Sequence, residues 1–299
     1  MPKTRSFGSI TRALLLSSRP LSWINTAYPF AAAYLLGTGR VDAPLIVGTI
    51  FFLIPYNLAM YGINDVFDYE SDLANPRKGG AEGAKLSPDL HRITLVTAGV
   101  LALPFIVVLA LWGTQHPWSL VIGALSLFAV IAYSVRGLRF KEVPVLDSVT
   151  SSTHFVTPAL FGITLAGTHI TLSLALAMGA FFLWGMASHA FGAVQDITPD
   201  RAAGISSIAT AFGSAATTRL AFGFWFAAGA LMLAAPWPAS LAALGAVPYL
   251  IAVAPYLNVT DDEAESANRA WRHFLVINYG VGFGLTILLI VCAQEGVFA

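Results

Sequence analysis

Long runs of apolar residues, separated by short polar segments, restrict this chain more than any other feature of its sequence. Nine of these runs reach the roughly 17 to 25 residues that a helix needs to cross the hydrocarbon core of a bilayer. They cover residues 21–38, 43–64, 93–113, 117–135, 147–167, 170–194, 213–234, 239–257 and 273–293. Because a bilayer core offers no water to unpaired backbone groups, such runs cross it as helices. We therefore predict an all-α polytopic membrane protein, a bundle of nine transmembrane helices.

The composition supports a membrane environment for the whole chain. Hydrophobic residues make up 57% of the 299 residues and charged residues only 11%, whereas an average soluble domain has about 25% charged residues. We find no segment in the sequence that reads as a separate soluble domain, and expect residues 1–299 to form a single integral-membrane domain. The one cysteine, Cys292, lies in the last apolar run, which argues against a disulfide framework or a cysteine-based metal site.

The Lys and Arg residues are sorted by side of the predicted membrane. With nine spans, 14 of the 16 Lys and Arg residues fall in the N-terminal segment or in the second, fourth, sixth and eighth loops, Arg219 lies near the start of the seventh span on the same side, and only Arg40 lies opposite. Basic residues of membrane proteins concentrate in cytoplasmic loops. This distribution predicts a cytoplasmic N-terminus and an external C-terminus, in the inner membrane of the cell. The formal net charge of zero hides this sorting and gives no reason to expect a nucleic acid partner.

Two acidic segments lie at the ends of the second and sixth apolar runs. NDVFDYESD places Asp65, Asp68 and Asp72 three and four residues apart, and QDITPDRAAG places Asp196 and Asp200 four apart. These spacings bring side chains to one face of a helix. One acidic loop alone would more simply be a solvated surface. Two such loops on one side of the membrane, with oxygen ligands and no clustered His or Cys, instead indicate Mg²⁺ and a phosphate-bearing ligand.

The helices that lead into the acidic segments carry further polar residues on one face. Asn57, Tyr61 and Asn64 precede the first segment at helical spacing, and His189 precedes the second, between Gly185 and Gly192. Because polar groups at membrane depth usually face a cavity or the interior of a bundle, we predict that both helices line one active-site cavity facing the cytoplasm. The two glycines either leave room for a ligand or allow close helix packing.

Three polar residues of the predicted cavity have simpler structural alternatives. His154 and His189 would by default be hydrogen-bond partners between helices. Asp147, at the predicted start of the fifth span, would by default be a helix N-cap. Their functional alternative is contact with a substrate inside the bundle.

Basic residues follow the first acidic segment and the fourth span. Arg77 and Lys78 belong to NPRKGG, and Arg139 and Lys141 belong to YSVRGLRFK. Arg and Lys are the natural donors to diphosphate oxygens. The positive-inside rule alone would explain any one of them, but together with the acidic segments and the neighbouring glycines they indicate a diphosphate site.

These segments and the hydropathy of essentially the whole chain resemble those of the UbiA-type membrane prenyltransferases. The resemblance implies a helical bundle in which two aspartate-rich motifs bind Mg²⁺-diphosphate, and an enzyme that transfers a prenyl group and releases diphosphate. The implied metal ligands are Asp65, Asp68, Asp72, Asp196 and Asp200, of which all but Asp72 are also expected to be catalytic. The implied substrate-binding residues are Asn64, Arg77, Lys78, Tyr133, Arg139 and Lys141. The polar residues predicted inside the cavity complete the candidate set: Asn57, Tyr61, Asp147, His154 and His189.

Four longer segments resemble, more narrowly, the lycopene elongases of the carotenoid branch. They read SRPLSWINTAYPFAAAYLLG, NDVFDYESDLANPRKGGAEGAKLSP, FKEVPVLDSVTSSTHFVTP and QDITPDRAAGISSIAT. This resemblance implies prenyl transfer from an allylic diphosphate, dimethylallyl diphosphate, to a lipophilic acceptor, lycopene, in long-chain carotenoid biosynthesis. Each transfer would end by proton loss or by hydration. Two alternatives stay open: the same chemistry on an aromatic acceptor of quinone biosynthesis, and a secondary transporter, whose site we would expect near the membrane midplane instead.

The predicted chemistry sets physical requirements on the cavity. Ionisation of an allylic diphosphate leaves an allyl cation, which must be kept from water. A dry apolar chamber with aromatic faces would contain it, because each cation–π contact is worth about 0.5 to 2 kcal/mol. Tyr61, Phe155, Trp184 and Phe191 are the aromatic residues that we expect to be available for this.

Overall fold

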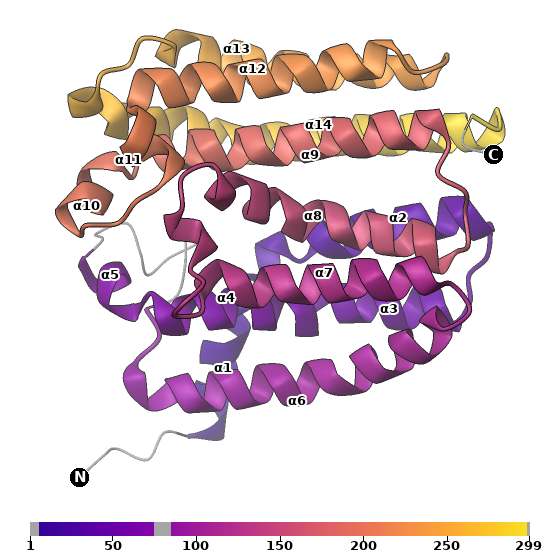
Figure 1. Cartoon of the computed structure of the whole chain (residues 1–299), viewed down its shortest axis with the longest axis horizontal. Coiled ribbons are helices and arrows are strands. Elements are labelled where there is room, and N and C mark those ends of the chain that lie inside the picture. The colour runs from indigo at the N-terminus through magenta and orange to yellow at the C-terminus, as the bar shows by residue number, and fades with distance from the viewer. Residues whose placement is uncertain (1–5, 75–84, 298–299) are drawn as a thin grey trace. The chain divides into compact units, whose positions relative to one another are not determined.

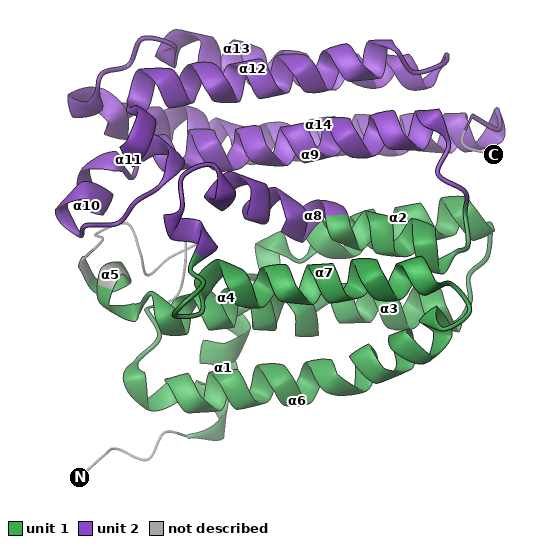
Figure 2. Cartoon of the chain, in the orientation of Figure 1, with its two compact units in different colours: residues 1–139, 157–168 green, residues 140–156, 169–299 purple. Residues whose placement is uncertain are grey.

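The computed structural model describes residues 6–74 and 85–297, and every regular element within these ranges is a helix (Figure 1). The chain divides into two compact units (Figure 2). Unit 1 contains residues 1–139 and 157–168, and unit 2 contains residues 140–156 and 169–299. Helix α8 (Leu146–Leu165) begins in unit 2 and ends in unit 1.

Both units are built from long helices joined by short ones. Unit 1 contains α1 (Phe7–Ser17), η1 (Pro20–Ser22), α2 (Ile24–Thr38), α3 (Ala43–Leu53), α4 (Pro55–Phe67), α5 (Tyr69–Ala74), α6 (Pro88–Gly113) and α7 (Pro117–Ser134). Unit 2 contains η2 (Phe140–Glu142), α9 (Leu172–Val194), α10 (Ile197–Ala202), α11 (Ile208–Phe212), α12 (Ser214–Leu233), η3 (Ala239–Ala246), α13 (Val247–Val253), η4 (Ala254–Tyr256), η5 (Asp261–Ala267) and α14 (Asn268–Gln294).

The predicted apolar ranges all coincide with helices, but not all of those helices meet the criterion for a span. Seven stretches of the described residues are long and apolar enough to cross a membrane. The predicted ranges outside this set are 21–38 and 147–167. There, α2 has only 15 residues, and α8 carries Ser, Thr and His through its first half. The all-helical membrane architecture is therefore confirmed, and the count of nine spans stays a prediction.

A break in the second predicted span shapes the core of unit 1. The helix is interrupted at Ile54, with Pro55 at the start of α4. The carbonyl oxygen of Phe52, released by this break, accepts hydrogen bonds from Thr26 Oγ1 and Asn57 Nδ2, both at 2.7 Å. Buried side chains thus donate hydrogen bonds to the backbone where the helical hydrogen-bond pattern is interrupted, as a membrane interior requires.

Aromatic rings fill the space around this break. Phe30 of α2 is fully buried and lies with its ring centroid 5.2 Å from that of Phe52 and 6.0 Å from that of Phe161. A Cβ atom at Gly48 would come within 2.1 Å of the Phe30 ring, and one at Gly162 within 2.6 Å of the Phe30 carbonyl oxygen. The glycines let three helices of unit 1 approach one another closely.

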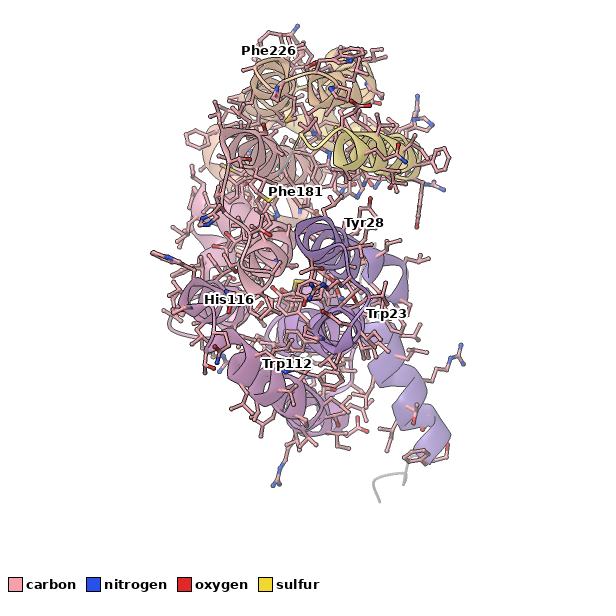
Figure 3. All side chains as sticks on the ribbon, turned by 90° about the vertical axis from the view of Figure 1, so that its right-hand side faces the viewer. Trp23, Tyr28, Trp112, His116, Phe181 and Phe226 are labelled. Atoms are coloured by element: carbon pink, nitrogen blue, oxygen red, sulfur yellow. The ribbon has the colours of Figure 1, made fainter. Side chains whose placement is uncertain are left out.

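Unit 2 has its own aromatic core, built on the packing of α9 against α12. Trp225 of α12 is fully buried and stacks on Tyr249 of α13 at a centroid distance of 5.5 Å. Phe274 of α14 lies 5.4 Å from the same tyrosine ring. The opposite face of α12 is apolar and exposed: Phe226, labelled in Figure 3, is 62% exposed. An apolar outer surface of this kind is what lipid contact requires.

Candidate active site

The first acidic segment begins where α4 ends. Asp65 lies in the last turn of α4, Asp68 is its C-cap with φ −101° and ψ 2°, and Asp72 lies in the six-residue helix α5. Backbone hydrogen bonds from Asp68 N to Asn64 O (2.9 Å) and from Asp72 N to Asp68 O (2.8 Å) continue the helical pattern through this junction. All three aspartates are buried, so their charges need partners within the protein or a ligand.

Asp65 is paired with a residue that the sequence analysis did not single out. Its Oδ1 lies 3.1 Å from Nη2 of Arg19, and its Oδ2 accepts a hydrogen bond of 2.8 Å from Ser17 Oγ. Arg19 follows α1 in a left-handed backbone conformation, and its guanidinium lies 4.3 Å above the ring of Tyr61. One face of the Tyr61 ring is therefore covered by a cation in this structure. Arg19 and Asp65 are 46 residues apart, and the sequence signals for Arg19 are that it is basic, is predicted to be cytoplasmic and lies in the segment SRPLSWINTAYPFAAAYLLG.

Asp68 is approached by one of the predicted basic residues. Nη2 of Arg139, in the segment after α7, lies 3.7 Å from Asp68 Oδ1, and Arg139 Nη1 donates to the carbonyl of Phe67 at 3.5 Å. Arg139 adopts a positive φ of 41°. At the end of α7, Ser134 Oγ donates to Asn64 Oδ1 at 3.0 Å, next to the half-buried Tyr133. Unit 1 therefore brings Asn64 and Arg139 to the end of α4, and Tyr133 lies in the last turn of α7 beside Ser134.

Asn57 has a different environment from the rest of the predicted polar stripe. It is fully buried, and its Nδ2 donates to Thr26 Oγ1 and to the carbonyls of Phe52 and Leu53. Nδ2 is thus occupied in stabilising the break between α3 and α4, whereas Oδ1 has no hydrogen-bond partner among the described residues. A role of Asn57 in substrate binding stays a prediction.

The second acidic segment repeats the local structure of the first. Helix α9 ends at Val194, Asp196 has φ −96° and ψ −2°, and the six-residue helix α10 carries Asp200. Asp200 N donates to Asp196 O at 2.9 Å, as Asp72 N does to Asp68 O. By backbone conformation Asp196 corresponds to Asp68. Asn64-Asp65 and Gln195-Asp196 are both carboxamide–aspartate pairs, but they do not occupy equivalent positions, because Asp65 lies three residues before Asp68.

Polar contacts within unit 2 hold the second segment in place. Arg201 at the end of α10 forms a 2.7 Å ion pair with Asp261 of η5 and donates to the Thr210 carbonyl at 3.3 Å. Asp261 Oδ1 also accepts hydrogen bonds from Ser214 N and Ser214 Oγ, both at 2.7 Å. Asp261 thereby connects η5 to α10 and to the start of α12.

Asp147 and His189 come together inside unit 2. Asp147 is fully buried in the first turn of α8, where its Oδ2 accepts from Ile208 N at 2.7 Å. Nε2 of His189 on α9 lies 3.7 Å from the same oxygen. The carboxylate connects α8 to the start of α11. Asp147 is therefore more than an N-cap of its own helix. His154, further along α8, is also buried.

The remaining predicted residues are placed as follows. Arg77 and Lys78 lie outside the described residues. Lys141 lies on η2, in unit 2. The glycines of α9 are packed against neighbours: a Cβ at Gly185 would come within 2.3 Å of Ser152 Oγ, and one at Gly192 within 3.2 Å of the Trp271 ring. Of the two interpretations of these glycines, the structure supports close helix packing.

Residues 26–278 match the model of the UbiA prenyltransferase family. The chain belongs to this family. It is 53% identical over 290 residues to a C(50) beta-cyclic carotenoids biosynthesis protein of a Dietzia species, a match that covers 97% of this chain and 67% of that protein. It is 51% identical over 285 residues to a lycopene elongase/hydratase of Corynebacterium glutamicum, covering 95% of this chain and 98% of the relative.

The fold is that of the family as well. A UbiA homolog from Archaeoglobus fulgidus, solved bound to GPP and Mg²⁺, superimposes with a TM-score of 0.65 at 16% identity, covering 90% of this chain and 99% of that one. The protein is thus an integral membrane prenyltransferase, as the resemblance implied. Membership of an enzyme family removes the transporter alternative.

The donor set fits Mg²⁺. Each acidic segment offers carboxylate oxygens only, and two of the carboxylates already lie against guanidinium groups, so the first segment attracts positive charge. Among the described residues, no three Asp, Glu, His or Cys side chains are grouped closely enough to hold a metal ion by themselves. Mg²⁺ usually takes one or two carboxylates and completes its coordination shell with water and substrate phosphates.

Proposed function

We propose that this prenyltransferase transfers a five-carbon unit from dimethylallyl diphosphate to lycopene, in the biosynthesis of long-chain carotenoids. The observation that carries the proposal is the 51% identity, over nearly the full length of both chains, to the lycopene elongase/hydratase of Corynebacterium glutamicum. Relatives of the same name from Halobacterium salinarum and Haloferax volcanii are 35% and 31% identical.

We propose that each acidic segment, with the basic residues near it, contributes to binding Mg²⁺ and the diphosphate. Asp65, Asp68 and Asp72 would hold Mg²⁺ from one segment, and Asp196 and Asp200 from the other. Bound Mg²⁺ would neutralise the charge that develops on the departing diphosphate. Arg139 and Arg19, which lie against Asp68 and Asp65, would donate to diphosphate oxygens from unit 1. The remaining predicted diphosphate contacts are Asn64, Arg77, Lys78, Tyr133 and Lys141.

Below the diphosphate, the chain's own task is to contain the allyl cation. The half-buried Trp184 of α9 and Phe155 of α8 are suited to this by their exposure. Phe191 is less suited, because it is 1% exposed and packs against Trp225 and Tyr256. Tyr61 would meet the cation with the ring face that Arg19 does not cover, or after Arg19 has turned to the diphosphate.

A carotenoid acceptor makes modest demands on catalytic groups. Its nucleophile is a terminal carbon–carbon double bond, which needs no base to activate it. The electron pair of this bond forms the new carbon–carbon bond and leaves a tertiary cation. Loss of a proton, or capture of water followed by loss of a proton, ends the reaction. So insoluble an acceptor would enter the bundle sideways from the lipid.

The proposed orientation follows the distribution of basic residues. Both acidic segments and the mouth of the active site would face the cytoplasm across the inner membrane, with the N-terminus cytoplasmic and the C-terminus outside. This places the mouth in contact with a water-soluble donor.

The deciding experiment offers the purified protein two acceptors. Protein reconstituted with Mg²⁺ is incubated with dimethylallyl diphosphate and either lycopene or 4-hydroxybenzoate, and products are examined by mass spectrometry. We expect lycopene to gain one or two five-carbon units, with or without added hydroxyl groups. Unchanged lycopene beside a prenylated phenol would contradict the carotenoid assignment and leave the aromatic alternative.

A further inference from the structure

The carboxylate of Asp147 is held rigidly inside unit 2. Oδ1 accepts from the backbone N of Ser148 at 2.6 Å and from Ser148 Oγ at 3.2 Å, and Oδ2 accepts from Ile208 N at 2.7 Å. All of these donors are neutral, and Asp147 is fully buried. An ionised carboxylate in such a place gains from a nearby cation.

His189 is the residue in position to become that cation. Within the described part of the chain it is the one ionisable side chain at ion-pair distance from Asp147, with Nε2 3.7 Å from Oδ2. The His189 side chain is 20% exposed, so it is not sealed in the core as Asp147 is. It precedes the C-terminal end of α9 by five residues and Asp196 by seven, which places it about 10 Å along the axis of α9 from the second acidic segment.

We propose that His189, oriented by Asp147, is the base that ends prenyl transfer. This inference rests on the proposed function. The carboxylate favours the neutral tautomer with hydrogen on Nε2 and holds the ring in place to accept the new proton. Protonation turns the ring into an imidazolium beside the negative charge of Asp147, an arrangement that stabilises the product of the proton transfer.

The reaction balances with this residue as the acceptor. The donor's carbon–oxygen bond breaks, and its electron pair leaves with the diphosphate. The acceptor double bond supplies the pair for the new carbon–carbon bond, and a tertiary cation remains on the acceptor. Either an adjacent carbon–hydrogen bond gives its electrons to a new double bond and its proton to His189, or the oxygen of a water bonds to the cation and a proton of that water goes to His189.

The position of His189 along α9 distinguishes its role as a base from that of the diphosphate leaving group. The leaving group is the other base in reach of an allyl cation, and it would remain at the acidic segments. A base two helical turns further into the membrane instead meets the acceptor end of the reaction. Asp147 would act only through His189, and is therefore a positioning residue.

The test measures how the reaction ends rather than only how fast it runs. His189→Gln and His189→Ala are compared with wild type in vesicles containing lycopene and Mg²⁺, with dimethylallyl diphosphate added. Diphosphate release and the ratio of hydrated to unhydrated products are both recorded. We expect the elongated product per diphosphate released to fall by roughly tenfold or more and the product ratio to change. Asp147→Asn should change the ratio in the same direction and by less.

His273→Gln, at an exposed histidine of α14, is the matched control and should leave the ratio as in wild type. A purely structural role for His189 predicts a lower rate with an unchanged product ratio, and that result in either folded His189 variant would overturn the proposal. Size-exclusion chromatography in detergent establishes folding. If wild type makes no elongated carotenoid at all, the proposed function itself is wrong. If wild type elongates lycopene and the His189 variants give the same product ratio as wild type, only the role of His189 is contradicted.

Discussion

At the scale of single residues, the acidic segments combine structural and functional demands. Asp65 is a predicted metal ligand at the end of a membrane span, where replacing an exposed carboxylate would cost the fold little stability. It is instead 1% exposed and bonded to Ser17 and Arg19. Removing it therefore affects the fold as well as the metal site, because Ser17 and the guanidinium of Arg19 lose their acceptor.

The substitution that separates these two effects is Asp65→Asn, which keeps the size of the side chain and one oxygen for Ser17. We expect turnover to fall by roughly 100-fold or more, because a metal ligand and a charge are lost. Asp65→Ala should in addition lower the free energy of unfolding by about 1 to 3 kcal/mol. Diphosphate release and thermal unfolding in detergent measure the two effects. Glu70→Gln, at an exposed acid of the same segment, is the control. EDTA should inhibit reversibly, and full activity in chelator would contradict a Mg²⁺-dependent mechanism.

At the scale of elements, the contact between α8 and α9 depends on one glycine. A Cβ at Gly185 would lie 2.3 Å from Ser152 Oγ and 3.1 Å from Ser152 Cα, so the backbone of α8 would have to shift. We expect Gly185→Ala to destabilise the protein by about 1 to 3 kcal/mol, seen as a lower melting temperature in detergent. Gly179→Ala on the same helix, where the nearest atom would be 3.6 Å away, is the tolerated counterpart. A stable Gly185→Ala protein with weakened acceptor binding would favour ligand space over packing.

The second acidic segment depends on contacts from η5. Asp261 bonds to Arg201 of α10 and to both donors of Ser214. Asp261→Ala should leave α10 less firmly placed, so that more Mg²⁺ is needed for half-maximal activity. The exposed ion pair contributes little stability by itself, so we expect only a small change in melting temperature. Asp262→Ala, at its exposed neighbour, should change neither quantity. An unchanged Mg²⁺ requirement in Asp261→Ala would show that α10 is held by other contacts.

At the scale of the whole molecule, the sorting of basic residues predicts the orientation in the membrane. Single cysteines placed at Lys141 or Asp262 in a Cys292→Ala background should react with an impermeant maleimide only from the cytoplasmic side. A reporter fused after Ala299 should be external. Labelling of position 141 from outside would mean that the span count is wrong and that the two acidic segments need not share a compartment.

The sequence by itself determined the membrane class, the helical ranges and the acidic motifs. Hydropathy is a sum over neighbouring residues, so it is readable without knowing the fold, and each aspartate motif lies within one short stretch of chain. The family resemblance rested on the same short stretches and on hydropathy. Both can be compared without knowing the fold, and the family match over residues 26–278 confirms the resemblance.

Tertiary structure decided which side chains meet. Arg19 pairs with Asp65 across 46 residues, Asp147 holds the backbone of Ile208 across 61, and Ser134 donates to Asn64 across 70. Such pairs depend on how each helix is rotated and on where it breaks, as at Pro55, and neither leaves a periodic signal in the sequence. The same holds for Gly185, because a small residue looks identical in a sequence whether a ligand or a neighbouring helix fills the space beside it. Only the packed helices distinguish the two, since the atoms that occupy the space come from another part of the chain.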